Sequence, residues 1–134
     1  MKTYVLDASA LLIFLQKKAV AKKLNELLKE AVHGRTDILM SAVNFGEVYG
    51  IVFREYGPER TMAIMDAVQP LPVTLIDATS QRARQAATLR IKYKLYYVDS
   101  FAAALAVEYQ ATLVTSDSDF RRLGHGFPLL WLKV

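Results

Sequence analysis

Cysteine is absent from the 134 residues of this chain, and histidine occurs only at His33 and His125. The lack of cysteine excludes disulfides, thiolate zinc sites and cysteine nucleophiles, and it fits a reducing cytoplasm. Long apolar runs are missing too, because the longest stretch near the start, Ala8–Leu15, is too short to cross a membrane. We therefore expect a soluble, cytosolic protein.

Glycine-rich phosphate loops are also missing. The six glycines never form the pattern of a dinucleotide-binding turn or of a Walker loop. A phosphorylated receiver domain would need a pair of acids at the end of the first strand, and only Asp7 stands there. These absences exclude the common nucleotide-binding and phosphoacceptor classes.

Short apolar segments alternate with segments of helical periodicity along the whole chain, which is typical of an α/β protein with a parallel sheet covered on both faces. The length and the 53% hydrophobic content predict one domain over residues 1–134. The expected strands are Thr3–Leu6, Ile38–Met40, Val73–Ile76, Thr112–Thr115 and Leu129–Leu132. The expected helices are Ala8–Gln16, Val20–His33, Ser41–Tyr56, Pro58–Val68, Asp77 or Thr79 to Lys94, and Asp99–Tyr109.

Four acids fall at one edge of this predicted sheet. Asp7 and Asp117 follow strands, and Asp99 opens a helix that starts from the same edge, where open parallel sheets bind their ligands. Glu47 lies inside a helix and shares a face with Asn44, three residues earlier. Each acid also has an ordinary interpretation, as a helix cap, a first-turn charge, a turn residue or an exposed glutamate.

Carboxylates held close together repel one another, so they must take up protons or bind a divalent cation. Oxygen ligands alone suit Mg²⁺ or Mn²⁺. The rest of the chain is basic, with 17 lysines and arginines against 13 acids in total. A basic surface around an acidic site suits a polyanion whose phosphate is bound through a cation, although a solvated basic surface is the ordinary alternative.

Four segments carry one of these acids each, namely Tyr4–Ala10, Asn44–Val48, Tyr97–Ala106 and Leu113–Phe120. In order, spacing and chain length they resemble the PIN-domain ribonucleases, in particular the short toxins of the virulence-associated protein B/C (VapBC) type II toxin–antitoxin systems. The resemblance implies a five-stranded parallel sheet in the order 3-2-1-4-5, a homodimer and a cognate antitoxin. Ser100 stands where an alanine is common in the family, a small departure.

The resemblance also implies the chemistry, which is hydrolysis of RNA phosphodiester bonds by a Mg²⁺- or Mn²⁺-dependent endoribonuclease. Asp7, Glu47, Asp99 and Asp117 are then the metal ligands and catalytic acids. Side chains that could orient waters or the ligands are Ser9, Thr115, Ser116 and Asp119, and Asp119 could instead be a fifth ligand. The alternative is a PIN-like module that binds RNA or protein without catalysis.

Overall fold

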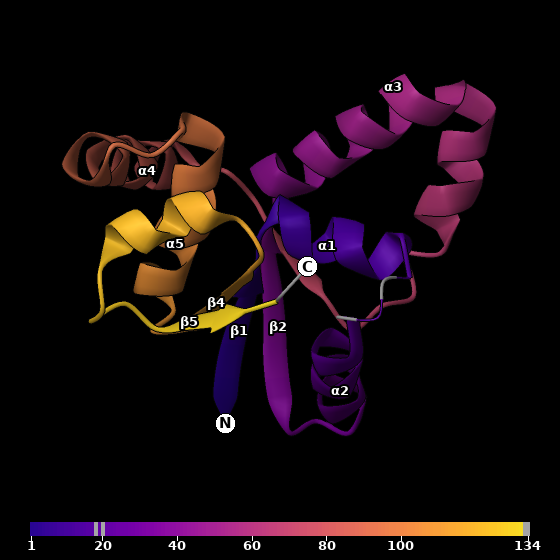
Figure 1. Ribbon diagram of the computed structural model, residues 1–134, viewed down its shortest axis with the longest axis horizontal. Coiled ribbons are helices and arrows are strands. Elements are labelled where there is room, and N and C mark those ends of the chain that lie inside the picture. The colour runs from indigo at the N-terminus through magenta and orange to yellow at the C-terminus, as the bar shows by residue number, and fades with distance from the viewer. Residues whose placement is uncertain (18, 20, 133–134) are drawn as a thin grey trace.

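The central strand carries side chains to both faces of a parallel sheet, as its unbroken apolar sequence predicts. A computed structural model describes residues 1–17, 19 and 21–132 (Figure 1). Its strands are β1 (Lys2–Leu6), β2 (Thr36–Ser41), β3 (Thr74–Ile76), β4 (Thr112–Thr115) and β5 (Leu129–Trp131). Its helices are α1 (Ala8–Leu15), α2 (Ala21–Val32), α3 (Ala42–Asp66), α4 (Ser80–Tyr93), α5 (Tyr97–Glu108) and the 3-10 helix η1 (Ser118–Leu123).

The strands form one parallel sheet in the order β3-β2-β1-β4-β5, which confirms the predicted topology. The chain moves outward from β1 to β3 and then returns to the other side of β1 with β4. The topological switch point therefore lies between β1 and β4, and ligands of open α/β sheets bind beside the carboxyl ends of the strands at such a point. Asp7 directly follows β1, and Asp117 lies two residues beyond β4.

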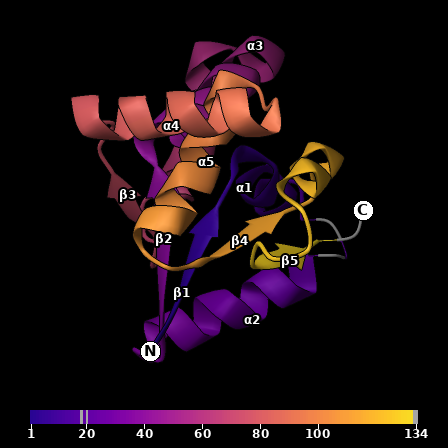
Figure 2. The ribbon, with the colours of Figure 1, turned by 90° about the vertical axis from the view of Figure 1, so that its left-hand side faces the viewer.

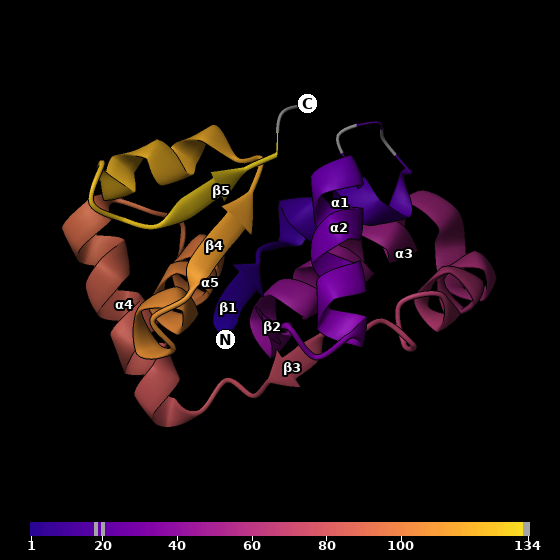
Figure 3. The same cartoon turned by 90° about the horizontal axis from the view of Figure 1, so that it is seen from below.

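Successive residues of β1 face opposite layers, because side chains alternate along a strand. Tyr4 and Leu6 pack with α1 and α2 on one face, whereas Val5 packs with α5 and η1 on the other. Figures 2 and 3 show α2 on one side of the sheet and α4 and α5 on the other. Within the described residues, no helix is long and apolar enough to span a membrane.

The helix α5 lies very close to the sheet because its inner face consists of alanines. Ala102 and Ala103 are fully buried and Ala106 is almost so, in one cluster with Val5 of β1 and Leu113 of β4. The helix α4 packs against the outer side of α5. A bidentate ion pair joins the two helices, with Arg82 Nε 3.0 Å from Glu108 Oε1 and Arg82 Nη2 2.9 Å from Glu108 Oε2. This packing brings the first turn of α5 to the carboxyl edge of the sheet.

The helix α3 bends sharply at Gly57, whose φ of 78° breaks the helical geometry, and Pro58 follows in the next turn. The sequence predicts two helices separated at this point, and the structure shows two arms of α3 that meet at a bend (Figure 1). Thr61 strengthens the bend by donating a 2.6 Å hydrogen bond to the Gly57 carbonyl. The first arm leads away from the sheet edge, and the second returns toward α1.

Two differences from the prediction bear on the site. The helix α5 begins at Tyr97, so Asp99 lies within its first turn and does not open it. The polar stretch after β4 is not a plain loop, because η1 forms there with Asp117 as its cap. The predicted start of the second helix at Val20 lies outside the described residues, and the described helix begins at Ala21.

The alanine face of α5 generates a test of its close packing. Replacing Ala103 by leucine adds volume to a fully buried position and should lower the free energy of unfolding by about 1–3 kcal/mol. Val107→Leu on the exposed side of the same helix is the matched control and should change it by less than about 0.5 kcal/mol. Urea denaturation followed by circular dichroism measures both, and equal stability of the two variants would contradict the close approach.

Candidate metal centre

Asp7 is the buried centre of the site, with only 4% of its surface exposed. One carboxylate oxygen, Oδ1, accepts hydrogen bonds from the Ala10 backbone N–H at 2.9 Å and from the Ser9 hydroxyl at 2.7 Å. The other oxygen, Oδ2, accepts a short hydrogen bond from the Thr115 hydroxyl at the end of β4. Asp7 is therefore the N-cap of α1, which is its ordinary interpretation, and it also bridges β1 and β4.

The hydroxyl groups of this bridge are themselves held by backbone donors. Ser9 Oγ accepts from the N–H of Ser116 at 2.9 Å, and Thr115 Oγ1 accepts from the N–H of Asp117 at 2.9 Å. A hydroxyl has a single proton to donate, and each of these protons is used on Asp7. The 3.3 Å contact between Ser9 and Thr115 oxygens is therefore a packing contact in this arrangement. Ser116 takes part through its backbone.

Three further carboxylates gather beside this bridge. One oxygen each from Asp99, Asp117 and Asp119 lies within 4.8 Å of the others, and all three side chains are half-buried. Asp99 comes from the first turn of α5, while Asp117 caps η1 by accepting from the Asp119 N–H at 2.9 Å. The three residues form the acidic group, and the sequence had left the role of Asp119 open.

A divalent cation fits the acidic group. Oxygens bound to one Mg²⁺ lie at most about 4.2 Å apart, since each bond is about 2.1 Å long. The three oxygens of the acidic group lie within 4.8 Å of one another, so they can converge on one cation when their side chains move toward it. The donor set consists of carboxylates alone, which favours Mg²⁺ or Mn²⁺ over softer metals.

Glu47 approaches the acidic group from the first arm of α3. It is half-buried, and burial first and the charge of Asp117 second raise its pKa above the ordinary value. Its own charge in turn acts on Asp99. Glu47 is thus near the acids from α5 and η1, although it is not one of the three whose oxygens lie within 4.8 Å of one another.

The electrostatic cost of this arrangement is largest for two further acids, Asp7 and Asp99. Burial raises the pKa of Asp7 to about 6, against the lowering effect of its hydrogen bonds from Thr115, Ser9 and Ala10. Burial also raises the pKa of Asp99 to about 7, and the charges of Asp117, Glu47, Asp7 and Asp119 add to the shift. The four predicted acids and Asp119 therefore interact electrostatically as one cluster.

One basic side chain, that of Arg122, lies beside the cluster. Arg122 places Nη2 3.9 Å from Asp119 Oδ1, and it donates from Nη1 to the Lys94 carbonyl at 2.8 Å. This arginine is half-exposed, so it can also meet a phosphate near the acids.

Asn44 belongs to the surroundings of the site, although sequence reasoning identified only the helical face that it shares with Glu47. Its side-chain Nδ2 donates to the carbonyl of Val98, the residue directly before Asp99, at 2.9 Å. Its Oδ1 is buried and has no hydrogen-bond partner. The sequence signal was a polar residue on the inward face of α3, one turn before the glutamate.

The fold and the cluster define an α/β protein whose acids gather at the carboxyl edge of a parallel sheet, at the switch point between β1 and β4. The family model of the PIN domain matches residues 4–126. The chain therefore belongs to the PIN-domain family. A comparison with curated protein sequences gave no match.

Solved structures with the same fold include several toxin–antitoxin complexes. VapBC2 from Rickettsia felis, bound to a DNA fragment from its promoter, has a TM-score of 0.76 at 20% identity over 96% of this chain and 97% of that chain. DNA-bound VapBC from Salmonella typhimurium has a TM-score of 0.75 at 16% identity over 98% and 99% of the two chains. VapC20 from Mycobacterium tuberculosis, a sarcin–ricin loop cleaving toxin, has a TM-score of 0.68 at 16% identity over 90% and 95%.

The raised pKa values predict a pH dependence of stability in the absence of metal. Above the ordinary pKa of 3.8, folded Asp7 holds a proton up to a pH of about 6, and folded Asp99 up to about 7, that the unfolded chain has lost. The free energy of unfolding must therefore fall as the pH rises through this range. With EDTA present, we expect Tm to be at least about 4 °C lower at about pH 8 than at about pH 5, since 1 kcal/mol shifts Tm by roughly 2–8 °C.

Asp99→Asn is the matched control for this measurement, because it keeps the shape of the side chain and removes one of the two titrating groups. Its Tm should fall less over the same pH interval. Calorimetry on both proteins makes the comparison, and an identical fall in the two would mean that Asp99 does not titrate as described.

Proposed function

We propose that this chain is a Mg²⁺- or Mn²⁺-dependent endoribonuclease that hydrolyses RNA phosphodiester bonds, and that it is the toxin of a type II toxin–antitoxin pair in the cytoplasm. The observation that carries the proposal is the acidic group, three carboxylate oxygens within 4.8 Å of one another, next to Glu47 and the buried Asp7. Such a cluster is unfavourable for the fold unless a cation binds, and membership of the PIN-domain family supports a nuclease.

Asp7, Glu47, Asp99 and Asp117 would hold the cation directly or through water, with Asp119 as a possible fifth ligand. When bound, a divalent cation supplies a water of lowered pKa and offsets the charge that develops on the phosphate and the leaving oxygen. The chain's own contribution is orientation. Ser9 and Thr115 fix both oxygens of Asp7, and burial between β1 and β4 keeps that carboxylate in a single position.

Replacing Asp99 by asparagine tests this function. The change removes ligand charge, so RNA cleavage should fall by at least about 100-fold, and the rise in Tm on adding millimolar Mn²⁺ should be lost. Cleavage of a structured RNA and thermal melting measure the two effects, with circular dichroism as the control for folding. Asp37→Asn, an exposed acid near the opposite end of β2, should behave as wild type.

The same experiment separates the nuclease from a non-catalytic PIN-like module. A module that only binds RNA or protein would tolerate the loss of its acids. Full cleavage activity in Asp99→Asn, or a wild-type protein without any Mn²⁺ response, would refute the assignment of the site.

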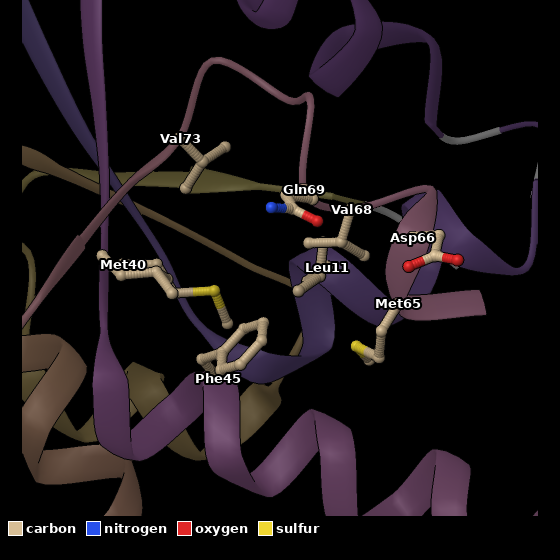
Figure 4. A pocket seen from close by; sticks show the side chains of 9 residues that line it. Leu11, Met40, Phe45, Met65, Asp66, Val68, Gln69 and Val73 are labelled. Atoms are coloured by element: carbon tan, nitrogen blue, oxygen red, sulfur yellow. The ribbon is translucent and has the colours of Figure 1, made fainter. Parts of the chain in front are cut away.

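An antitoxin partner is supported by an apolar groove beside the site. The groove lies between α1, the end of β2, the first turn of α3 and the second arm of α3 (Figure 4). Its lining side chains include Leu11, Met40, Phe45, Met65, Val68 and Val73. A second hollow follows along α1 and the second arm of α3, lined by Phe14, Leu15, Ala21 and Ile64 among others. An apolar helix of a partner can bury its face here.

The groove adjoins the site at α1, since Leu11, which lines the groove, stands one turn after Asp7 and donates its backbone N–H to the Asp7 carbonyl. We infer that the antitoxin covers the groove with apolar side chains and extends a basic side chain into the acidic cluster. An arginine there would form charge-assisted hydrogen bonds to the carboxylates and take the place of metal and phosphate.

A homodimer is supported by an exposed aromatic stripe on the first arm of α3. Tyr49, Phe53 and Tyr56 recur at helical spacing and are 42%, 45% and 41% exposed, respectively. Contiguous exposed apolar patches are typical of protein interaction sites. We propose that a second copy of this chain covers the stripe.

A glutamate in the groove tests the antitoxin site. Met65→Glu places a charge among the apolar side chains and should abolish copurification with the antitoxin, while the RNA cleavage of the isolated toxin is retained. Met62→Glu, 68% exposed on the same arm of α3, is the matched control and should copurify normally. Copurification of Met65→Glu at the wild-type level would show that the antitoxin binds elsewhere.

A further inference from the structure

Asn44 joins the two helices that bring Glu47 and Asp99 to the site. It lies in the first turn of α3, one turn before Glu47 and on the same face of the helix. Its Nδ2 donates a 2.9 Å hydrogen bond to the carbonyl oxygen of Val98. This carbonyl belongs to the peptide bond that joins Val98 to Asp99. A single side chain thus links the turn before one acid to the peptide of another.

The fold alone does not explain an amide at this position. Asn44 is 1% exposed, and its Oδ1 has no partner, so burying it costs free energy. Apolar contacts already hold α3 against its neighbours, because Val43 packs against Phe101 and Ala104 of α5. A leucine of similar size would fill the space of Asn44 without leaving an acceptor unpaired.

What the amide adds is direction. Apolar packing is non-directional, whereas the hydrogen bond to Val98 requires one distance and one angle. The bond therefore sets the rotation and height of the first turn of α3 relative to the first turn of α5. The charges of Glu47 and Asp99 already interact across this junction.

We propose that Asn44 is a positioning residue that fixes Glu47 relative to Asp99 through its hydrogen bond to the Val98 carbonyl, so that both acids can serve one divalent cation. This inference rests on the proposed metal-dependent function and adds a residue outside the acids to it. Asn44 touches neither the cation nor the RNA. Its loss should weaken cation binding without weakening the fold.

Asn44→Leu separates positioning from stability. In EDTA the Tm of the variant should equal or exceed that of wild type, because the unpaired oxygen is removed along with the donor. The dissociation constant for Mn²⁺, measured by titration calorimetry on the full chain, should rise at least ten-fold. The kcat for RNA cleavage at a fixed low Mn²⁺ concentration should fall, with KM for RNA unchanged.

Ser100→Ala is the matched control, because it removes another buried side-chain hydrogen bond in the first turn of α5, from Ser100 Oγ to the Tyr96 carbonyl, without touching α3. Its Mn²⁺ affinity should stay within two-fold of wild type. If Asn44→Leu does not fold, Asn44→Ala is measured by the same criteria. Failure of both variants to fold would show a structural role and overturn the inference.

The two possible failures are distinct. A wild-type protein that binds no Mn²⁺ refutes the proposed function itself. Wild-type binding together with an Asn44→Leu affinity within two-fold of it refutes only the positioning role.

Discussion

The site depends on one buried carboxylate that ties the centre of the sheet together. Asp7 accepts hydrogen bonds from the first turn of α1 and from Thr115 at the end of β4, and its own backbone N–H donates to the Val114 carbonyl. These bonds join the carboxyl ends of β1 and β4, the neighbouring strands at which the strand order reverses. Asp117 and Asp119 are positioned relative to this junction, because η1 and its cap Asp117 follow directly from β4.

The acidic cluster destabilises the metal-free fold, and the apolar core of the protein compensates for this cost. Burial and mutual repulsion raise the pKa of Asp7 and Asp99, so the ionised metal-free protein is less stable than its core alone would make it. The supporting framework is the pair of apolar layers around the sheet, with the alanine face of α5 allowing the closest approach. A cation bound in the cluster would offset this repulsion and so stabilise the folded protein.

The bend of α3 allows one helix to serve two purposes. The first arm carries Asn44 and Glu47 to the acids, and the second arm returns to α1 and lines the apolar groove. Gly57 makes the bend possible because its positive φ carries no Cβ penalty. The two arms of α3 therefore contribute to the acidic cluster and to the groove separately.

The local sequence was enough to predict much of the fold and of the candidate site. The period of apolar residues predicted the alternation of strands and helices, and Gly57 predicted the break in α3. The positions of Asp7, Asp99 and Asp117 at the ends of elements predicted that they share one edge of the sheet. All these signals depend on neighbours in the chain. Four features could be found only in the tertiary structure. They are the start of α5 at Tyr97, the 3-10 helix after β4, the place of Asp119 in the acidic group and the hydrogen bond from Asn44 to Val98. They depend on contacts between residues far apart in sequence: Asn44 and Val98 are 54 positions apart, and only the packing of α3 against α5 brings that donor to that carbonyl.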